Sequence, residues 1–379
     1  MTERTCPSCR EVSPADASFC EACGARLDGS EPVATPAAGG AAAGGNAPTL
    51  AQESPVSAAT VPAKGAESPA APVPSRPPCT QCGGAVADDL YCTQCGAKAP
   101  SERDHFREAP ASWVAGVCDR GVKHHRNEDA MALAALPEPG SHAAIVVCDG
   151  VSSSKDSDVA ALAGARAALE VLRAPLPAGI GVPQSADAAA VRAFGAAAAA
   201  ANTAVIAHTD PASTSPASCT FVAAVVAPTL IRFAHIGDSR AYLFPDAGEA
   251  RQLTIDHSMA QQLVAGGMSR EQAESSPQAH SITRWLGLDS EDYVPEVSSA
   301  PVEGPGWLLV CSDGLWNYAS EPAALAAQLA ATGASEPAGM ALALVEWAKA
   351  QGGHDNITVA LARVGDAAYS ATTKESTDG

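Results

Sequence analysis

The chain has 379 residues and a formal net charge of −19, with 23 lysine and arginine residues against 42 aspartate and glutamate residues. A protein this acidic, without a run of lysine or arginine, lacks the basic face that DNA, RNA or anionic membranes require, so none of these is expected as its main partner. The N-terminus has no hydrophobic core of a signal peptide, and polar residues or prolines break the longest apolar stretches before the roughly 20 residues needed to span a bilayer. We therefore expect a cytoplasmic protein.

Most of the 12 cysteines fall in Cys-x-x-Cys pairs near the start of the chain. The pairs group into two modules, residues 1–27 and residues 79–98, which resemble zinc ribbons. A Cys-x-x-Cys turn points two sulfurs inward, and two such turns complete a tetrahedral thiolate site. Zinc is favoured over redox or disulfide use because the expected compartment is reducing. The ligands of the two expected structural zinc ions are Cys6, Cys9, Cys20, Cys23, Cys79, Cys82, Cys92 and Cys95.

The segments around these modules are poor in large apolar residues. Residues 28–78 are rich in alanine, proline, glycine and serine, which predicts a disordered linker. Residues 99–111 are interpreted as a short polar connection, and residues 367–379 as a disordered tail. The remaining cysteines lie in or beside apolar runs, where cysteine usually packs as a small hydrophobic residue; they are Cys118, Cys148, Cys219 and Cys311.

Residues 112–366 form the large domain, in which apolar runs typical of strands alternate with alanine-rich stretches typical of helices. Strands are expected at 113–118, 143–148, 219–227, 230–236, 240–244, 307–311 and 357–363. Helices are expected at 157–173, 186–208, 258–265, 321–331 and 336–350, with a short helix around 270–275 capped by Ser269 and Gln272. Many strands follow one another closely, which favours an α+β fold of antiparallel sheets with helices outside.

Four aspartates lie where a predicted strand meets a loop: Asp149, Asp238, Asp313 and Asp355. A carboxylate at a strand end is held by the sheet and still reachable by solvent. Several carboxylates converging on one edge repel one another unless a cation lies between them, and oxygen-only ligation suits magnesium or manganese. Any single one of them is more often an ordinary turn residue. Their coincidence predicts a metal-dependent hydrolase, possibly with two metals.

A mixed acidic and basic cluster precedes Asp149 and contains His124, Arg126, Glu128 and Asp129. A site for phosphate and metal needs carboxylates for the cation and hydrogen-bond donors for phosphate oxygens. Taken alone, the cluster is typical of a solvated charged loop.

The ordered motifs together resemble a known family. Asn-Glu-Asp, a strand followed by Asp-Gly, Gly-Asp-Ser-Arg, Ser-Asp-Gly-Leu-Trp and Asp-Asn-Ile-Thr occur between residues 113 and 365. This order is similar to that of the metal-dependent type 2C Ser/Thr protein phosphatase family in its bacterial form. The resemblance implies a four-layer α-β-β-α sandwich of two antiparallel sheets flanked by helices.

The resemblance also implies roles for individual residues. Asp149 would bridge two manganese or magnesium ions, and the Gly150 carbonyl, Asp313 and Asp355 would complete their ligands. Glu128 and Asp129 would orient metal-bound waters, Asp238 would support them, and Asn356 would lie beside the site. The implied reaction is direct attack of a metal-activated water on phosphoserine or phosphothreonine, without a phosphoenzyme intermediate. The segment from Asp256 to Gly287 corresponds to the family's mobile flap, and an ordinary helix–loop insertion is an equal alternative.

Three departures from the family pattern bear on activity. His124 stands at the usual position of a phosphate-binding arginine, so His124 or Arg126 would contact phosphate. Val151-Ser152-Ser153-Ser154 replaces a glycine-rich stretch after the bridging aspartate. Ser215 stands where bacterial members often carry an aspartate for a third metal, so that metal is predicted to be weak or missing.

Three function hypotheses follow. The leading one is an active phosphatase that reverses Ser/Thr kinase signalling on phosphorylated proteins. The alternative is a catalytically impaired phosphatase-like sensory or protein-binding module, motivated by the three departures. A nucleic-acid-binding protein driven by the zinc ribbons is disfavoured by the acidic charge, so the ribbons are interpreted as protein-binding or autoregulatory modules.

Overall fold

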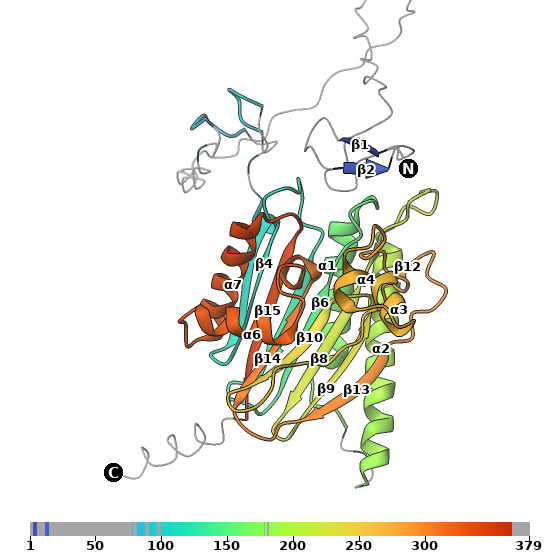
Figure 1. Cartoon of the computed structure of the whole chain (residues 1–379), viewed down its shortest axis with the longest axis vertical. Helices are drawn as coiled ribbons and strands as arrows, with labels where there is room; N and C mark the ends of the chain where they lie inside the picture. Colours follow the sequence, from blue (N-terminus) through green and yellow to red (C-terminus); the bar gives the residue numbers. More distant parts are fainter. Residues whose placement is uncertain are drawn as a thin grey trace, which may run out of the picture.

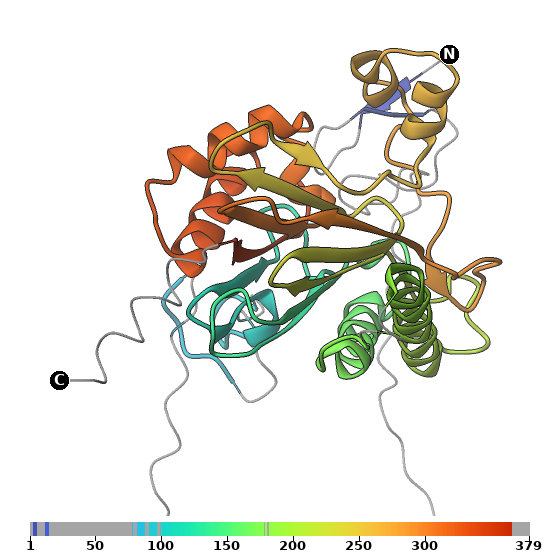
Figure 2. The same cartoon turned by 90° about the horizontal axis from the view of Figure 1, so that it is seen from below.

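The computed structural model describes residues 3–5, 12–14, 78, 82–87, 91–96, 99, 101–177, 179 and 182–365. Two antiparallel sheets pack face to face, and helices cover both outer faces (Figures 1 and 2). The linker, the tail and the cysteines Cys6, Cys9, Cys20, Cys23 and Cys79 lie outside the described residues, and Pro78 is the one described residue of the linker range. In the first module, only strands β1 (Glu3–Thr5) and β2 (Val12–Pro14) are described, as an antiparallel pair.

The first sheet has six strands in the order β11-β10-β14-β15-β4-β3. Their bounds are β3 His105–Ala111, β4 Val114–Asp119, β10 Arg240–Pro245, β11 Arg251–Gln252, β14 Gly306–Cys311 and β15 Ile357–Val364. The short 3-10 helix η1 (Glu102–Asp104) precedes β3. Helices α5 (Asp313–Trp316), α6 (Pro322–Ala331) and α7 (Pro337–Gln351) cover the outer face of this sheet.

The second sheet has five strands in the order β13-β9-β8-β6-β5. Their bounds are β5 Ala130–Ala135, β6 Ala143–Cys148, β8 Phe221–Ala227, β9 Leu230–Ile236 and β13 Glu296–Pro301. Helices α1 (Ser157–Leu172) and α2 (Pro183–Ala207) cover its outer face. The short strands β7 (Ser218–Cys219) and β12 (Leu286–Gly287) form a separate pair, and helices α3 (Met259–Ala265) and α4 (Arg270–Glu274) lie between β11 and β12 in the chain.

Side-chain alternation along the central strands creates the layers. In β6, Val146 and Cys148 face α1 and α2, whereas Ile145 and Val147 face the other sheet. Because successive strand residues point to opposite faces, a strand covered on both sides is apolar throughout, and β6 is buried at every position. Three separate hydrophobic clusters result, one between the sheets and one beneath each helical layer. The expected four-layer α-β-β-α arrangement is therefore confirmed for the large domain.

Helix α2 is the one helix among the described residues that is long and apolar enough to cross a membrane by length and composition. Its buried side chains Phe194 and Val205 belong to the cluster under the five-stranded sheet. A Cβ atom added at Gly164 of α1 would come within 3.1 Å of Val205 Cγ2, so the two helices approach closely. The apolar face of α2 is therefore explained by the packing of α2 against α1 and the sheet.

The structure corrects the interpretation of residues 99–111 as a polar connection. Residues 105–111 form β3, which pairs with β4 at the edge of the six-stranded sheet, so the sheet begins upstream of residue 112. An edge strand faces water on one side, and its charged residues Arg107 and Glu108 concealed the strand pattern. Four further strands of the large domain were missed. Strand β5 is rich in alanine, a weak strand former, and β13 is a polar edge strand. Strands β11 and β12 have only two residues each.

Candidate metal centre

The sheet topology brings the predicted acidic residues to one edge of the sandwich. Strands β6 and β9 run in the same direction because β8 lies antiparallel between them, so Asp149 and Asp238 follow at the same end. In the other sheet, β14 ends where its antiparallel neighbour β15 begins, which brings Asp313 and Asp355 together. Strand β5 begins opposite the end of β6, with Ala130 paired to Cys148, so Glu128 and Asp129 reach the same edge.

The carboxylates lie close enough to perturb one another. Burial raises the pKa of Asp149 well above its usual range, and the charges of Asp129, Asp313, Asp355 and Asp238 raise it further. The pKa of Asp313 is likewise raised by burial and then by Asp355 and Asp238. Charged carboxylates in such a group are costly without a compensating cation.

Asp129 is completely buried and fixed by two hydroxyl groups. Its Oδ2 accepts hydrogen bonds from Ser312 Oγ at 2.6 Å and Thr358 Oγ1 at 2.8 Å. Burial raises its pKa to about 7, although these two hydrogen bonds oppose the shift. Ser312 and Thr358 belong to the Ser-Asp-Gly-Leu-Trp and Asp-Asn-Ile-Thr motifs, but sequence reasoning gave them no role. The available signal was a hydroxyl residue in each motif, Ser312 next to Asp313 and Thr358 three residues after Asp355.

Glu128 lies between the two basic residues of the cluster. Its Oε1 accepts a hydrogen bond from Arg126 Nε at 2.6 Å, and its Oε2 lies 3.8 Å from His124 Nδ1. The same Arg126 donates to the Ser154 carbonyl at 2.7 Å, so its guanidinium is already engaged on both sides. His124 Nε2 lies 3.4 Å from Asp355 Oδ1. Of the two expected phosphate contacts, His124 is therefore the one that faces the metal-ligand aspartates.

The pKa of His124 is raised despite its burial. Burial alone lowers it, but the neighbouring carboxylates of Glu128 and Asp355 outweigh that effect. A histidine held between two carboxylates favours the imidazolium form, which donates hydrogen bonds to an anion.

Asn356 holds the acidic loop rather than facing a ligand. Its Oδ1 accepts a hydrogen bond from the Glu128 N–H at 2.7 Å, and its Nδ2 donates to the carbonyls of Arg120 and Arg126 at 2.8 and 3.1 Å. With all three side-chain contacts made to backbone groups, Asn356 positions the loop between β4 and β5.

Two glycines permit close backbone approach at this edge. A Cβ atom at Gly150 would lie 2.7 Å from the Glu128 carbonyl oxygen, and one at Gly314 would lie 1.9 Å from the Asn356 carbonyl oxygen. Any larger residue at either position would push the loops apart. The glycines of the Asp-Gly pairs at 149–150 and 313–314 are thus required by packing.

The oxygen atoms available in this group fit divalent cations. Asp129 Oδ1, Glu128 Oε2 and Asp313 Oδ1 are buried side-chain atoms without a hydrogen-bond partner among the described residues. Buried polar atoms almost always have a hydrogen-bond partner, and a site for an ion is one of the few explanations when they have none. The donor set is made of carboxylate and carbonyl oxygens, which magnesium and manganese prefer.

The serine stretch after Asp149 contacts the segment around Ser215 and Ser218. Ser154 Oγ lies 3.3 Å from Ser218 Oγ, and the Val151 N–H donates to the Ser218 carbonyl at 2.9 Å. Ser215 Oγ donates to the Ser153 carbonyl at 3.0 Å, which ties the predicted third-metal position to the same loop. The absence of a third metal stays a prediction.

A cleft of about 340 Å³ adjoins the acidic edge. It is lined by His124 and Asp355 from the acidic edge, and by Glu274 and His280 from the segment between residues 256 and 287. Trp316, from helix α5, lies at its base, and its Nε1 donates to the Asp238 carbonyl at 3.0 Å. The segment that contains α3 and α4 (Figure 1) thus contributes two residues to the lining of the cleft, and its role as a flap stays a prediction.

A second group of possible metal ligands already has a cation beside it. His235, His257 and Glu296 converge near the start of the flap segment, with His257 Nε2 at 3.0 Å from Glu296 Oε1. The guanidinium of Arg284 lies 3.2 Å from His257 Nε2 and 3.6 Å from Glu296 Oε1. Arg284 therefore supplies a positive charge beside Glu296 and His257.

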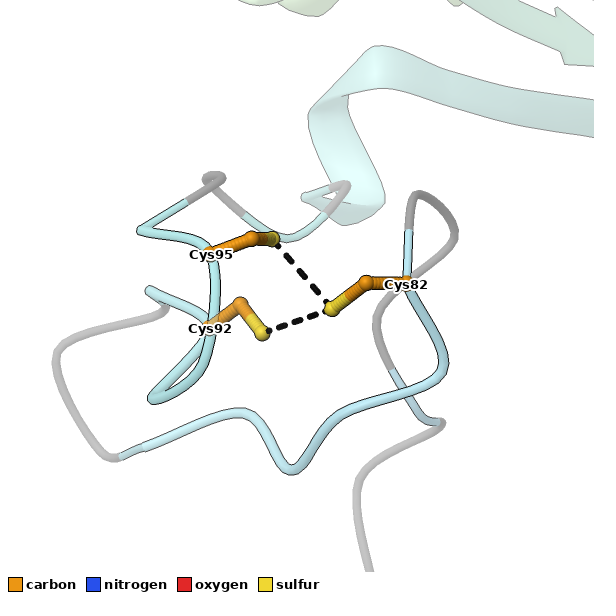
Figure 3. A group of neighbouring side chains, drawn as sticks. All are labelled: Cys82, Cys92 and Cys95. Carbon is orange, nitrogen blue, oxygen red and sulfur yellow. Dashed lines mark hydrogen bonds between the residues drawn. The ribbon is translucent and has the colours of Figure 1, made fainter.

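Three thiols of the second cysteine module converge in the same way as the sequence predicts (Figure 3). Cys82 Sγ lies 3.5 Å from Cys92 Sγ and 3.3 Å from Cys95 Sγ. Val86 and Cys92 form an antiparallel bridge, which brings the two turns together. Backbone N–H groups of Cys95 and Gln94 lower the pKa of the Cys92 thiol to about 6, so the thiolate form that ligates metals predominates at neutral pH.

The raised carboxyl pKa values predict that metal-free protein loses stability as pH rises. Asp129 and Asp238 each have a folded-state pKa of about 7 against an ordinary value of 3.8, mainly through burial. Between these values the folded state binds more protons than the unfolded state, so the free energy of unfolding falls as pH increases. Thermal melts with chelator should give a higher melting temperature at pH 5 than at pH 7.5, and manganese should remove the difference. A chelated protein more stable at pH 7.5 would contradict the raised values.

Comparisons with known proteins agree with this geometry. The protein phosphatase 2C family model matches residues 120–348, more than half of the chain. The serine/threonine phosphatase stp of Listeria welshimeri is 36% identical over 143 residues, which are 38% of this chain and 55% of that protein. The chain therefore spans about half the length of this curated relative.

Two solved structures share the fold. The Mycobacterium tuberculosis serine/threonine phosphatase PstP/Ppp aligns with a TM-score of 0.53 and 27% identity, covering 66% of this chain and 98% of that one. The catalytic domain of the serine/threonine protein phosphatase PstP, in complex with two manganese ions, aligns with a TM-score of 0.51 and 25% identity, covering 66% and 97%.

Proposed function

Because the chain belongs to the protein phosphatase 2C family, we propose that it is a metal-dependent phosphatase that hydrolyses phosphoserine and phosphothreonine in proteins. The observation that carries this proposal is the group of buried carboxylates at one sheet edge with unsatisfied oxygens at Asp129, Glu128 and Asp313. The PstP catalytic domain with two manganese ions supports the choice of metal.

Asp149, the Gly150 carbonyl, Asp313 and Asp355 would hold the two manganese or magnesium ions. When bound, these ions would lower the pKa of a water molecule and neutralise charge on the phosphoryl oxygens. Third-metal binding at Ser215 is proposed to be weak or missing, since a hydroxyl engaged with a backbone carbonyl is a poor replacement for a carboxylate.

The protein's own residues would bind and orient the substrate. His124 faces the cleft between Glu128 and Asp355, and in its imidazolium form it would donate a hydrogen bond to a phosphate oxygen. Asp129 is held by Ser312 and Thr358, and Glu128 by Arg126, so both carboxylates would accept hydrogen bonds from a water molecule and orient it. Trp316 and Asn356 keep the surrounding loops in place.

Turnover of a phosphothreonine peptide with manganese, with magnesium and with chelator tests this proposal. We expect release of phosphate only with a divalent cation. A wild-type protein that binds manganese and releases no phosphate would instead favour the alternative, an impaired phosphatase-like sensory or protein-binding module. The engagement of Arg126 with Glu128 and Ser154 is the observation that favours this alternative, because the guanidinium of Arg126 is then not available for phosphate.

We further propose that the two cysteine modules are zinc ribbons that recognise proteins. The convergence of Cys82, Cys92 and Cys95 supports one structural zinc, and the similar spacing of Cys6, Cys9, Cys20 and Cys23 in the sequence supports the other. Phosphorylated proteins and a Ser/Thr kinase system of a bacterial cytoplasm are the proposed partners, and nucleic acid and membranes are not.

Replacing Cys92 by serine should remove one zinc ion per chain. A hydroxyl does not replace a thiolate ligand, and a module this small depends on its metal to fold. Metal analysis of the purified full chain should give one zinc fewer than wild type, with phosphatase turnover retained. Thr93→Ala, at the neighbouring residue, is the control and should keep all its zinc. An unchanged zinc content in Cys92→Ser would contradict the ribbon.

A further inference from the structure

The short helix η1 connects the second cysteine module to the first sheet strand and carries Arg103. Its position is fixed by its own contacts: Asp104 Oδ2 accepts from the Ser101 N–H at 2.9 Å, and the Asp104 carbonyl accepts from the Arg120 N–H at 2.8 Å. The planar guanidinium of Arg103 lies over the ring of Phe106 at 5.2 Å. This arginine is therefore held at the base of the loop between β4 and β5.

Arg103 contacts the Asn-Glu-Asp loop through both its main chain and its side chain. Its carbonyl accepts a hydrogen bond from Asn127 Nδ2 at 3.0 Å. Its Nη2 donates to the carbonyl of Asp129 and, at 3.2 Å, to the carbonyl of Asp158 in the first turn of α1. One side chain thus joins the acidic loop to the helix that follows the Asp149 loop.

These contacts fix the main chain of Asp129 in addition to its carboxylate. The carboxylate of Asp129 is held by Ser312 and Thr358, and its carbonyl is held by Arg103. With both ends held, the side chain has one orientation in the acidic group. A charged, planar donor is suited to this task, because hydrogen bonds from a guanidinium are stronger and more directional than those from neutral groups.

We propose that Arg103 is a positioning residue of the phosphatase centre, supplied by the connection to the cysteine module. The family model matches residues 120–348, and Arg103 lies upstream of them. The contact between Arg103 and Asp129 therefore comes from a residue outside the matched part of the chain. This inference rests on the proposed phosphatase function for its effect on turnover, but its effect on the acidic loop is independent of catalysis.

The test compares Arg103→Met with Arg107→Met in the full chain. Methionine keeps much of the packing on Phe106 and removes the hydrogen bonds to the Asp129 and Asp158 carbonyls, together with a contact of 3.9 Å to Cys118 Sγ. Arg107 is an exposed arginine of β3. For Arg103→Met we expect kcat on a phosphothreonine peptide to fall by about 10- to 100-fold, as for other residues that orient a metal site, with KM changed less than about twofold. Added guanidinium ion should restore part of kcat, and Arg107→Met should resemble wild type.

Hydrogen exchange of the Glu128 amide provides the readout that does not depend on catalysis. This N–H donates to Asn356 Oδ1, so a loosened loop should exchange it faster in Arg103→Met and not in Arg107→Met. A kcat within about twofold of wild type would overturn the proposal, as would a lower kcat without faster exchange and without rescue. If the wild type has no turnover, the proposed function fails and the exchange rates alone decide the role of Arg103. If Arg103→Met does not fold, Arg103→Lys takes its place under the same criteria.

Discussion

Asp149→Asn is expected to lower kcat/KM for a phosphothreonine peptide by at least about 10³-fold, because bridging ligation supplies several kcal/mol of charge stabilisation in the transition state. The same change should raise the melting temperature of the metal-free protein, by on the order of 3 °C. Asp149 is buried among Asp129, Asp313, Asp355 and Asp238, and its charge is destabilising there without a cation. Opposite effects on activity and on stability are typical of a site organised for a ligand.

The matched control for this variant is Asp187→Asn. Asp187 is an exposed residue of α2 paired with Arg232, and neutralising it removes the same charge from a surface where ion pairs contribute little. Kinetics and thermal melts with chelator give both quantities for both variants. If Asp149→Asn retained wild-type turnover, or melted at a lower temperature than wild type without metal, the assignment of Asp149 to a cation site would be wrong.

Arg240→Met is expected to destabilise the protein by about 3–5 kcal/mol, which lowers the melting temperature by roughly 10 °C. Arg240 is 1% exposed, and its guanidinium binds both oxygens of Asp256, at 2.9 and 2.6 Å. It also donates to the Tyr242 hydroxyl at 3.1 Å and lies 3.5 Å from the centre of the Trp316 ring. Methionine would leave the Asp256 charge buried without its partner, and this uncompensated charge dominates the cost.

Arg363→Met is the matched control for the burial effect. Arg363 also forms a two-point ion pair, with Asp246 at 2.7 and 2.6 Å, and also lies over an indole ring, that of Trp307 at 5.1 Å. Because Asp246 is about half exposed, this change should cost only about 1 kcal/mol. The double variant Arg240→Met with Asp256→Leu should recover part of the lost stability. Equal losses in the two single arginine variants would contradict the account of Arg240.

The sequence predicted which aspartates gather at the acidic edge because they occur beside strands that are apolar along their whole length. Asp149, Asp313 and Asp355 each adjoin a strand buried on both faces, β6, β14 or β15, and such strands are recognisable without a structure. The edge strands β3 and β13 were not predicted, since a strand that faces water carries polar residues that are also common in loops.

The supporting contacts could not be predicted from the sequence, because they join residues far apart in the chain. The hydrogen bonds from Ser312 and Thr358 to Asp129 span 183 and 229 positions. Arg126 was an equal alternative to His124 for phosphate until the structure showed its contacts with Glu128 and Ser154. Local pattern identifies which residues can ligate a metal, whereas the packing of distant strands decides which neighbours hold them.

Anomalous diffraction from crystals grown with manganese would show whether the acidic edge holds two divalent cations. We expect two manganese ions bridged by Asp149, one in contact with the Gly150 carbonyl and one with Asp313 and Asp355. Manganese absent from this edge at saturating concentration, or bound only elsewhere on the protein, would mean that these carboxylates are not a metal centre.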